Sequence, residues 1–213
     1  MIDKKYNKNY FNRNSLKNKN LFKKYLKLLM KNKISMKNIS LCDIGCATGE
    51  FINMMKDTNL CFGVDTSRYA ITECKKRFPK IKNNFFCLDL NSSYLDINQS
   101  FDIITLFDVI EHLENFSNFK KLILEKLKNN GYLIVTTPNA NSILRLILKK
   151  GFTGELDKTH TILFTPYTLD FFLRRIGLKR IALFTPFRFY MKYNFLTKNL
   201  LFGGQIYAIY KKV

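Results

Sequence analysis

The chain has 213 residues, of which 46% are hydrophobic, and its formal net charge is +20. This length and hydrophobic content suit one folded domain with a core, which excludes global disorder. No apolar run reaches the roughly 18 residues of a membrane span, so no transmembrane helix is expected. The basic N-terminus also lacks the apolar stretch of a secretory signal.

Cysteine and histidine usage bears on metals and on redox environment. The five cysteines include no C-x-x-C pair, and the chain has only two histidines. Zinc sites gather closely spaced Cys and His ligands, so this composition argues against one and no metal is expected. Scattered, odd-numbered cysteines are typical of reduced thiols, which predicts a cytoplasmic protein.

Positive charge is concentrated near the start of the chain. Residues 1–40 hold eleven Lys and one Arg against one Asp, a net charge of +11, and the rest of the chain carries the other +9. Residues 15–33 also place apolar side chains at helical spacing. We therefore expect residues 1–37 to form a basic arm and an amphipathic helix. This helix is expected to pack on the domain, while contact with an anionic membrane or with a polyanion stays open.

From residue 38 onward, short apolar segments alternate with helical ones. Strands are expected at 39–44, 60–65, 84–90, 101–110, 132–138, 178–187 and 204–213. Helices are expected at 50–57, 66–78, 117–131, 141–150 and 165–177. Apolar strands that alternate with helices predict an α/β fold with a mostly parallel sheet and helices on both faces.

The stretch "LCDIGCATGEF" (41–51) reads as a strand end, a turn of small residues and a helix start. A dinucleotide fingerprint would need glycine where Ala47 and Glu50 stand, and no Gly-Lys-Ser/Thr of a phosphate loop is present. The ligand of this turn is therefore not expected to be held through phosphates. Acidic side chains at Asp43 and Glu50 favour a cationic group instead.

The next two strands also end in acidic residues. Asp65 lies 22 residues after Asp43, which is close to the position whose carboxylate binds ribose hydroxyls in nucleotide-binding folds. Asp89 lies at the end of the third expected strand, where a carboxylate could meet an amino group on a base. Simpler alternatives stay open: Asp65 could cap the following helix, and Asp43 could be a buried, hydrogen-bonded carboxylate.

Five segments in order resemble the motifs of class I S-adenosylmethionine-dependent methyltransferases: "LCDIGCATGEF", "GVDTS", "CLDL", "FDIITLFDVIEHL" and "GYLIVTTPN". The resemblance implies a Rossmann-like sheet of seven strands with an antiparallel last strand, formed by residues 38–213. It implies S-adenosylmethionine as the cofactor. By position it assigns the methionine part to Asp43, Gly45, Cys46 and Gly49. It assigns the ribose hydroxyls to Asp65, and the adenine to Thr66, Asp89 and Leu90. It places Phe107 and Asp108 beside the sulfonium.

The segment around His160, "DKTHTILFTPYTL", resembles the corresponding stretch of ubiquinone-type and sugar O-methyltransferases. This resemblance implies an acceptor pocket built from 139–175 and 188–203, and methylation of an oxygen. Such an oxygen usually loses a proton, for which a histidine is suited. His160 is the first candidate for this base and His112 the second, and a purely structural role for both stays open.

The expected function is O-methylation of a small-molecule, glycan or lipid-linked acceptor. An RNA acceptor is the first alternative, because the arm is basic. The chain lacks the Pro-Pro-aromatic and Pro-Cys signatures of the main base-modifying enzymes. A cofactor-binding partner protein without catalysis is the second alternative. The oligomeric state and the methylated atom are not predicted.

Overall fold

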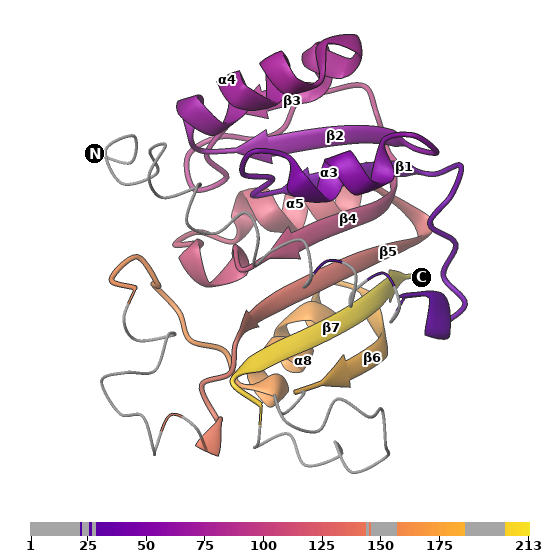
Figure 1. Ribbon diagram of the computed structural model, residues 1–213. Helices are drawn as coiled ribbons and strands as arrows, with labels where there is room; N and C mark the ends of the chain where they lie inside the picture. Colours follow the sequence, from indigo (N-terminus) through magenta and orange to yellow (C-terminus); the bar gives the residue numbers. More distant parts are fainter. Residues whose placement is uncertain (1–21, 23–25, 27–28, 144, 146–156, 186–202) are drawn as a thin grey trace. The chain divides into compact units, whose positions relative to one another are not determined.

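The computed structural model describes residues 22, 26, 29–143, 145, 157–185 and 203–213 (Figure 1). Its seven strands form one sheet in the order β3-β2-β1-β4-β5-β7-β6. The chain divides into two compact units, residues 1–105 and 106–213. The predicted boundary at residue 37/38 stays a prediction.

The described residues of the first unit include three parallel strands and two complete α-helices. The strands are β1 (Ser40–Ile44), β2 (Leu60–Asp65) and β3 (Phe85–Cys87), and the helices are α3 (Glu50–Met55) and α4 (Arg68–Arg77), with a 3-10 segment η1 (Pro79–Asn84). Every residue of β1 is buried. Strand β4 (Phe101–Phe107) begins in this unit. β3 is shorter than the predicted strand 84–90, so Asp89 lies in the loop after the strand and not at its end.

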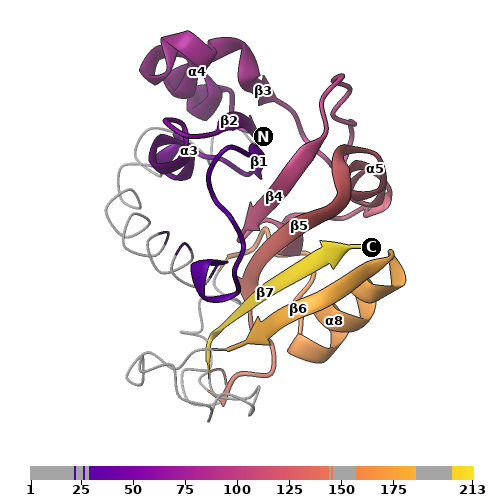
Figure 2. The same ribbon diagram turned by 90° about the vertical axis from the view of Figure 1, so that its right-hand side faces the viewer.

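The second unit follows with η2 (Ile110–His112), α5 (Ser117–Lys126), β5 (Leu127–Pro138), α8 (Pro166–Arg175), β6 (Leu178–Phe184) and β7 (Gln205–Lys212). β7 lies between β5 and β6 and is antiparallel to both, as Figure 1 and Figure 2 show. The predicted antiparallel last strand is therefore confirmed.

Helix α5 ends earlier than the predicted 117–131. Lys212 Nζ donates hydrogen bonds to the carbonyl oxygens of Leu124 and Leu127, at 2.6 and 2.7 Å. A cation at these positions satisfies carbonyl groups that a helix end leaves without intrahelical partners. Residues 127–131 therefore belong to β5 and not to the helix.

The N-terminal segment packs where it is described. Leu29 is fully buried, and the ring of Phe22 lies 5.3 Å from that of Phe51 in α3. The other apolar positions of the predicted helix, Leu21, Tyr25 and Leu28, lie outside the described residues, as do 141–150 in large part and 188–202. No helix in the described part of the chain is long and apolar enough to cross a membrane.

Candidate active site

The turn after β1 has an unusual backbone. Gly45, Ala47 and Gly49 all have positive φ, at 75°, 49° and 79°. A Cβ atom on Gly49 would lie 2.6 Å from the ring of Phe78, so both the backbone and the packing require glycine there. Ala47 adopts the left-handed conformation despite its side chain, which costs roughly 1 kcal/mol or more. The turn is thus held in a conformation that its local sequence does not fully favour.

Asp65 holds this turn in place. Its Oδ2 accepts a hydrogen bond from the Ala47 N–H, and its Oδ1 accepts one from the Ser67 N–H, both at 2.8 Å. Ser67, not Asp65, is the N-cap of α4, because its hydroxyl accepts from the Ala70 N–H. Burial raises the pKa of Asp65, although these backbone hydrogen bonds act to lower it. A carboxylate oxygen has further lone pairs, so Asp65 can still accept hydroxyl donors.

Asp43 is a buried carboxylate with a neutral partner. Its side chain is 2% exposed, and Oδ1 accepts a hydrogen bond of 2.6 Å from Thr105 Oγ1. Burial, with added repulsion from Asp65 and Glu50, raises the pKa of Asp43 to about 7. Glu50 itself receives hydrogen bonds from Thr48 and Arg77. The first unit therefore gathers three acidic groups around the turn, which suits a positively charged ligand.

The other predicted cofactor residues of this unit differ in accessibility. Cys46 and Leu90 are buried, each 4% exposed. A hydrogen bond with neighbouring Cys74, together with burial, raises the pKa of the Cys46 thiol. Leu90 therefore presents little surface on which a base could stack. Thr66 is half-buried, and Asp89 Oδ1 accepts a hydrogen bond from the Asn91 N–H.

In the second unit, Asp108 follows half-buried Phe107 with a strained backbone, φ 56°. Its N–H donates to the Thr136 carbonyl at 3.1 Å, and its Oδ1 accepts from Thr136 Oγ1 at 3.1 Å and from Gln205 Nε2. Non-glycine residues with positive φ are often found at functional sites. These contacts hold Asp108 at the point where the chain leaves β4.

The two candidate histidines, 48 residues apart in sequence, lie together. Their ring centroids are 4.7 Å apart. Thr161 and Ile162 donate backbone hydrogen bonds of 2.9 and 3.2 Å to the carbonyl of Glu111, which brings the loop that carries His160 against η2. The sequence indicated His160 and His112 as alternative candidates for one base, whereas in the structure their rings lie next to each other.

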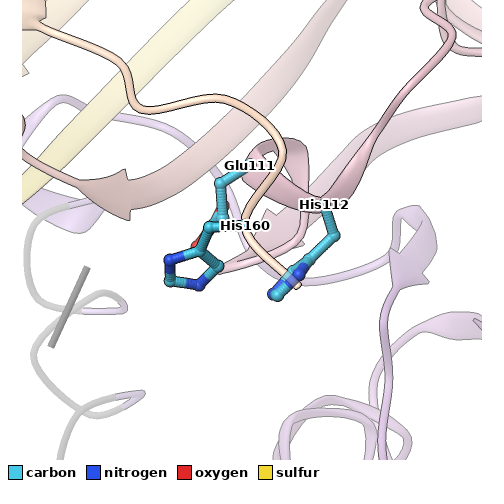
Figure 3. A group of neighbouring side chains, drawn as sticks. All are labelled: Glu111, His112 and His160. Atoms are coloured by element: carbon cyan, nitrogen blue, oxygen red, sulfur yellow. The ribbon is translucent and has the colours of Figure 1, made fainter. Parts of the chain in front are cut away.

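Glu111, which the sequence did not indicate as a site residue, lies beside the two histidines. Figure 3 shows the side chains of Glu111, His112 and His160 converging; a carboxylate oxygen and one ring nitrogen of each histidine lie within 4.8 Å of one another. We call this set the Glu-His-His cluster. Burial and the nearby charge of Asp108 raise the pKa of Glu111 well above its usual range. The available sequence signal was an acidic residue inside the apolar stretch "VIEHL", beside a candidate histidine.

Comparison with known proteins decides the family. A family model described as a methyltransferase domain matches residues 12–183. The chain belongs to this methyltransferase domain family.

Individual relatives agree with this membership. The methyltransferase domain is 30% identical over 120 residues to an uncharacterized protein of Methanocaldococcus jannaschii, covering 56% of this chain and 50% of that protein. It is 29% identical over 111 residues to the mitochondrial ubiquinone biosynthesis O-methyltransferase of Schizosaccharomyces pombe, covering 50% of this chain and 40% of that protein. The chain thus spans about half the length, or less, of these curated relatives.

Solved structures agree on the fold. A SAM-dependent methyltransferase from Archaeoglobus fulgidus matches with a TM-score of 0.60 at 24% identity, over 89% of this chain and 99% of that one. The predicted methyltransferase family and the Rossmann-like fold are therefore confirmed. The roles of individual residues stay predictions.

Replacing Gly49 with alanine should destabilise the methyltransferase domain by about 2–4 kcal/mol, because a positive φ and a clash with Phe78 add together. Gly177→Ala is the matched control: its φ is +90°, but a Cβ there would meet nothing within 4 Å. It should cost only about 1 kcal/mol. Urea denaturation measures both, and equal losses would contradict the packing argument.

Asp43 should make stability fall as pH rises. Its pKa is about 7 in the folded protein against an ordinary value of 3.8, so between these values the unfolded chain ionises while the folded one stays protonated. We expect the free energy of unfolding to decrease from about pH 4 to about pH 7. The Asp43→Asn variant should show a flatter profile in denaturant titrations at pH 4.5 and 7.5. Identical profiles would rule out this assignment.

Proposed function

We propose that this methyltransferase domain transfers the methyl group of S-adenosylmethionine to an oxygen of a small-molecule, glycan or lipid-linked acceptor. The observation that carries the choice of oxygen is the Glu-His-His cluster, which places two imidazoles side by side next to a buried carboxylate. When bound, the cofactor supplies an electrophilic methyl group on a sulfonium. The chain's task is then to bind, orient and exclude water.

The first unit is proposed to hold the cofactor. Asp65 can accept both ribose hydroxyls through the lone pairs that its backbone hydrogen bonds leave, and charge-assisted bonds of this kind are strong. The acidic surroundings of Asp43 favour the positive charges of the methionine part. Thr66, Asp89 and Leu90 are proposed to lie beside the adenine, with stacking on Leu90 limited by its burial. From the second unit, Phe107 and Asp108 are proposed to lie beside the sulfonium.

The second unit is proposed to receive the acceptor. In the protein without a bound metal, the imidazole of His160 is the group proposed to take the hydroxyl proton, with His112 beside it. The name of the fission yeast relative, a ubiquinone biosynthesis O-methyltransferase, supports an oxygen acceptor.

An RNA acceptor is a second candidate, because residues 1–40 carry a net charge of +11. Incubation of the protein with methyl-labelled cofactor and lysate fractions separates the candidates. Label in lipid, glycan or small metabolites supports the proposal, and label in RNA supports the second candidate. Cofactor binding without transfer to any fraction would favour a partner protein that does not catalyse.

Replacing Asp65 with alanine should weaken cofactor binding by about 1.5–3 kcal/mol, because it removes charge-assisted hydrogen bonds. Ser67→Ala is the control, since it removes the cap of α4 but leaves the Asp65 carboxylate in place. Isothermal titration calorimetry with S-adenosylhomocysteine measures both. An Asp65→Ala variant with wild-type affinity would refute the ribose assignment.

Replacing His160 with alanine should lower kcat by about 100-fold or more, the usual contribution of a positioned acid or base. Cofactor affinity should change much less than kcat, since Asp65, the proposed ligand of the ribose, belongs to the first unit. Turnover with an accepted substrate and calorimetry with cofactor give the two readouts. Full turnover would leave His160 with a structural role only.

A further inference from the structure

The Glu-His-His cluster has the dimensions of a metal site. One ligand atom from each of Glu111, His112 and His160 lies within 4.8 Å of the other two. Nitrogen and oxygen ligands about 2.0–2.2 Å from one zinc ion lie about 3–3.5 Å from each other. The most distant ligand atoms therefore need to approach by up to about 1.3–1.8 Å, which rotations of the two rings can supply.

The carboxylate of Glu111 is buried and only partly hydrogen-bonded. This side chain is 0% exposed, and its Oε2 accepts a hydrogen bond of 2.9 Å from Thr137 Oγ1. Its Oε1 is buried and has no hydrogen-bond partner among the described residues. A buried polar atom left in this way destabilises the folded protein. A cation bound between the carboxylate and the imidazoles would remove that cost.

His112 is held in the tautomer that a metal ligand needs. Its Nδ1 lies 3.0 Å from the Thr159 carbonyl oxygen and 3.1 Å from Thr159 Oγ1. That hydroxyl gives its own proton to Asp157 Oδ1 at 2.6 Å, so both Thr159 oxygens face His112 as acceptors. The ring proton is thereby assigned to Nδ1 and the lone pair to Nε2. Metal-binding histidines commonly donate their second ring nitrogen to a carbonyl in this manner.

The scaffold fixes His160 relative to Glu111. Thr161 Oγ1 donates to the carbonyl oxygens of Glu111 and Leu113 at 3.1 and 3.0 Å, in addition to the backbone hydrogen bonds of this loop. Asp108 is close enough to interact electrostatically with both Glu111 and His160. A second negative charge beside the cluster favours a divalent cation further.

We propose that Glu111, His112 and His160 bind one divalent first-row transition cation of the zinc, cobalt or manganese class. Two imidazoles and one carboxylate are a ligand set that such ions accept, with positions left open for another ligand. Magnesium prefers oxygen ligands, so it should bind more weakly. The sequence argued against a metal because it shows only two histidines; the fold brings them together and adds a third ligand that the sequence did not single out.

A cation bound at this site would also favour a hydroxyl group as the methyl acceptor. This inference rests on the proposed function. A cation with open positions binds a hydroxyl group and lowers its pKa. The O–H proton then leaves to solvent, the oxygen lone pair forms the new O–C bond, and the C–S bond electrons stay on sulfur. Both imidazoles serve as ligands in the loaded protein, so neither acts as the base there.

Spectroscopy with cobalt tests the site directly on the untagged full chain after treatment with a chelator. Addition of Co²⁺ should produce visible d–d absorption that saturates at one ion per chain, without the near-ultraviolet band of a cobalt–sulfur bond. Glu111→Gln and His160→Ala should each weaken binding at least tenfold, whereas Glu114→Gln, which removes an exposed carboxylate, should not. Circular dichroism checks that each variant is folded.

Nuclear magnetic resonance provides a test that needs no variant. The chain has only two histidines, so two imidazole spin systems report on the site. Addition of Zn²⁺ should shift both, and the same concentration of Mg²⁺ should shift them less. Unchanged imidazole signals, a cobalt–sulfur band, or variants that bind Co²⁺ like the wild type would overturn the inference. If the protein binds no Co²⁺ but still methylates an oxygen, the metal site is contradicted and the proposed function is not. If it binds the metal but methylates no oxygen, only the proposed acceptor is contradicted.

Discussion

Buried carboxylates with neutral hydrogen-bond partners are the constraint on which both units depend. Asp43 pairs with a threonine hydroxyl, Asp65 with two backbone N–H groups, and Glu111 with another threonine hydroxyl. Neutral donors stabilise a buried negative charge only partly, which is why the pKa of each of these groups is raised. A bound cation or a hydrogen-bond donor of a ligand near each carboxylate would offset the remaining cost, so binding and stability are coupled at both places.

The carboxylates have different roles in the two units. In the first, Asp65 links the turn after β1 to the start of α4, so the group proposed to bind the ribose also maintains the turn. In the second, the carbonyl of Glu111 anchors the 157–162 loop while its carboxylate joins two imidazoles. Backbone and side chain of one residue thus assemble a cluster from segments far apart in sequence.

Much of the first unit could be predicted because its signals are local. Asp43 lies in the apolar strand β1, Asp65 ends the strand β2, and the glycines of the turn are read from eleven consecutive residues. The helix expected at 66–78 begins two residues later, at Arg68, because Ser67 is its N-cap. The cluster could not be predicted, since it depends on hydrogen bonds between residues about 50 positions apart. The burial that gives Glu111 its chemistry is likewise a property of the packed unit and is not visible in the sequence.

A crystal structure of the chain grown with S-adenosylhomocysteine tests the central claim most directly. The account predicts a nucleoside whose two ribose hydroxyls lie within hydrogen-bonding distance of the Asp65 carboxylate, with its methionine part at the turn 45–49. A nucleoside bound elsewhere, or a pyrophosphate seated on that turn, would contradict it.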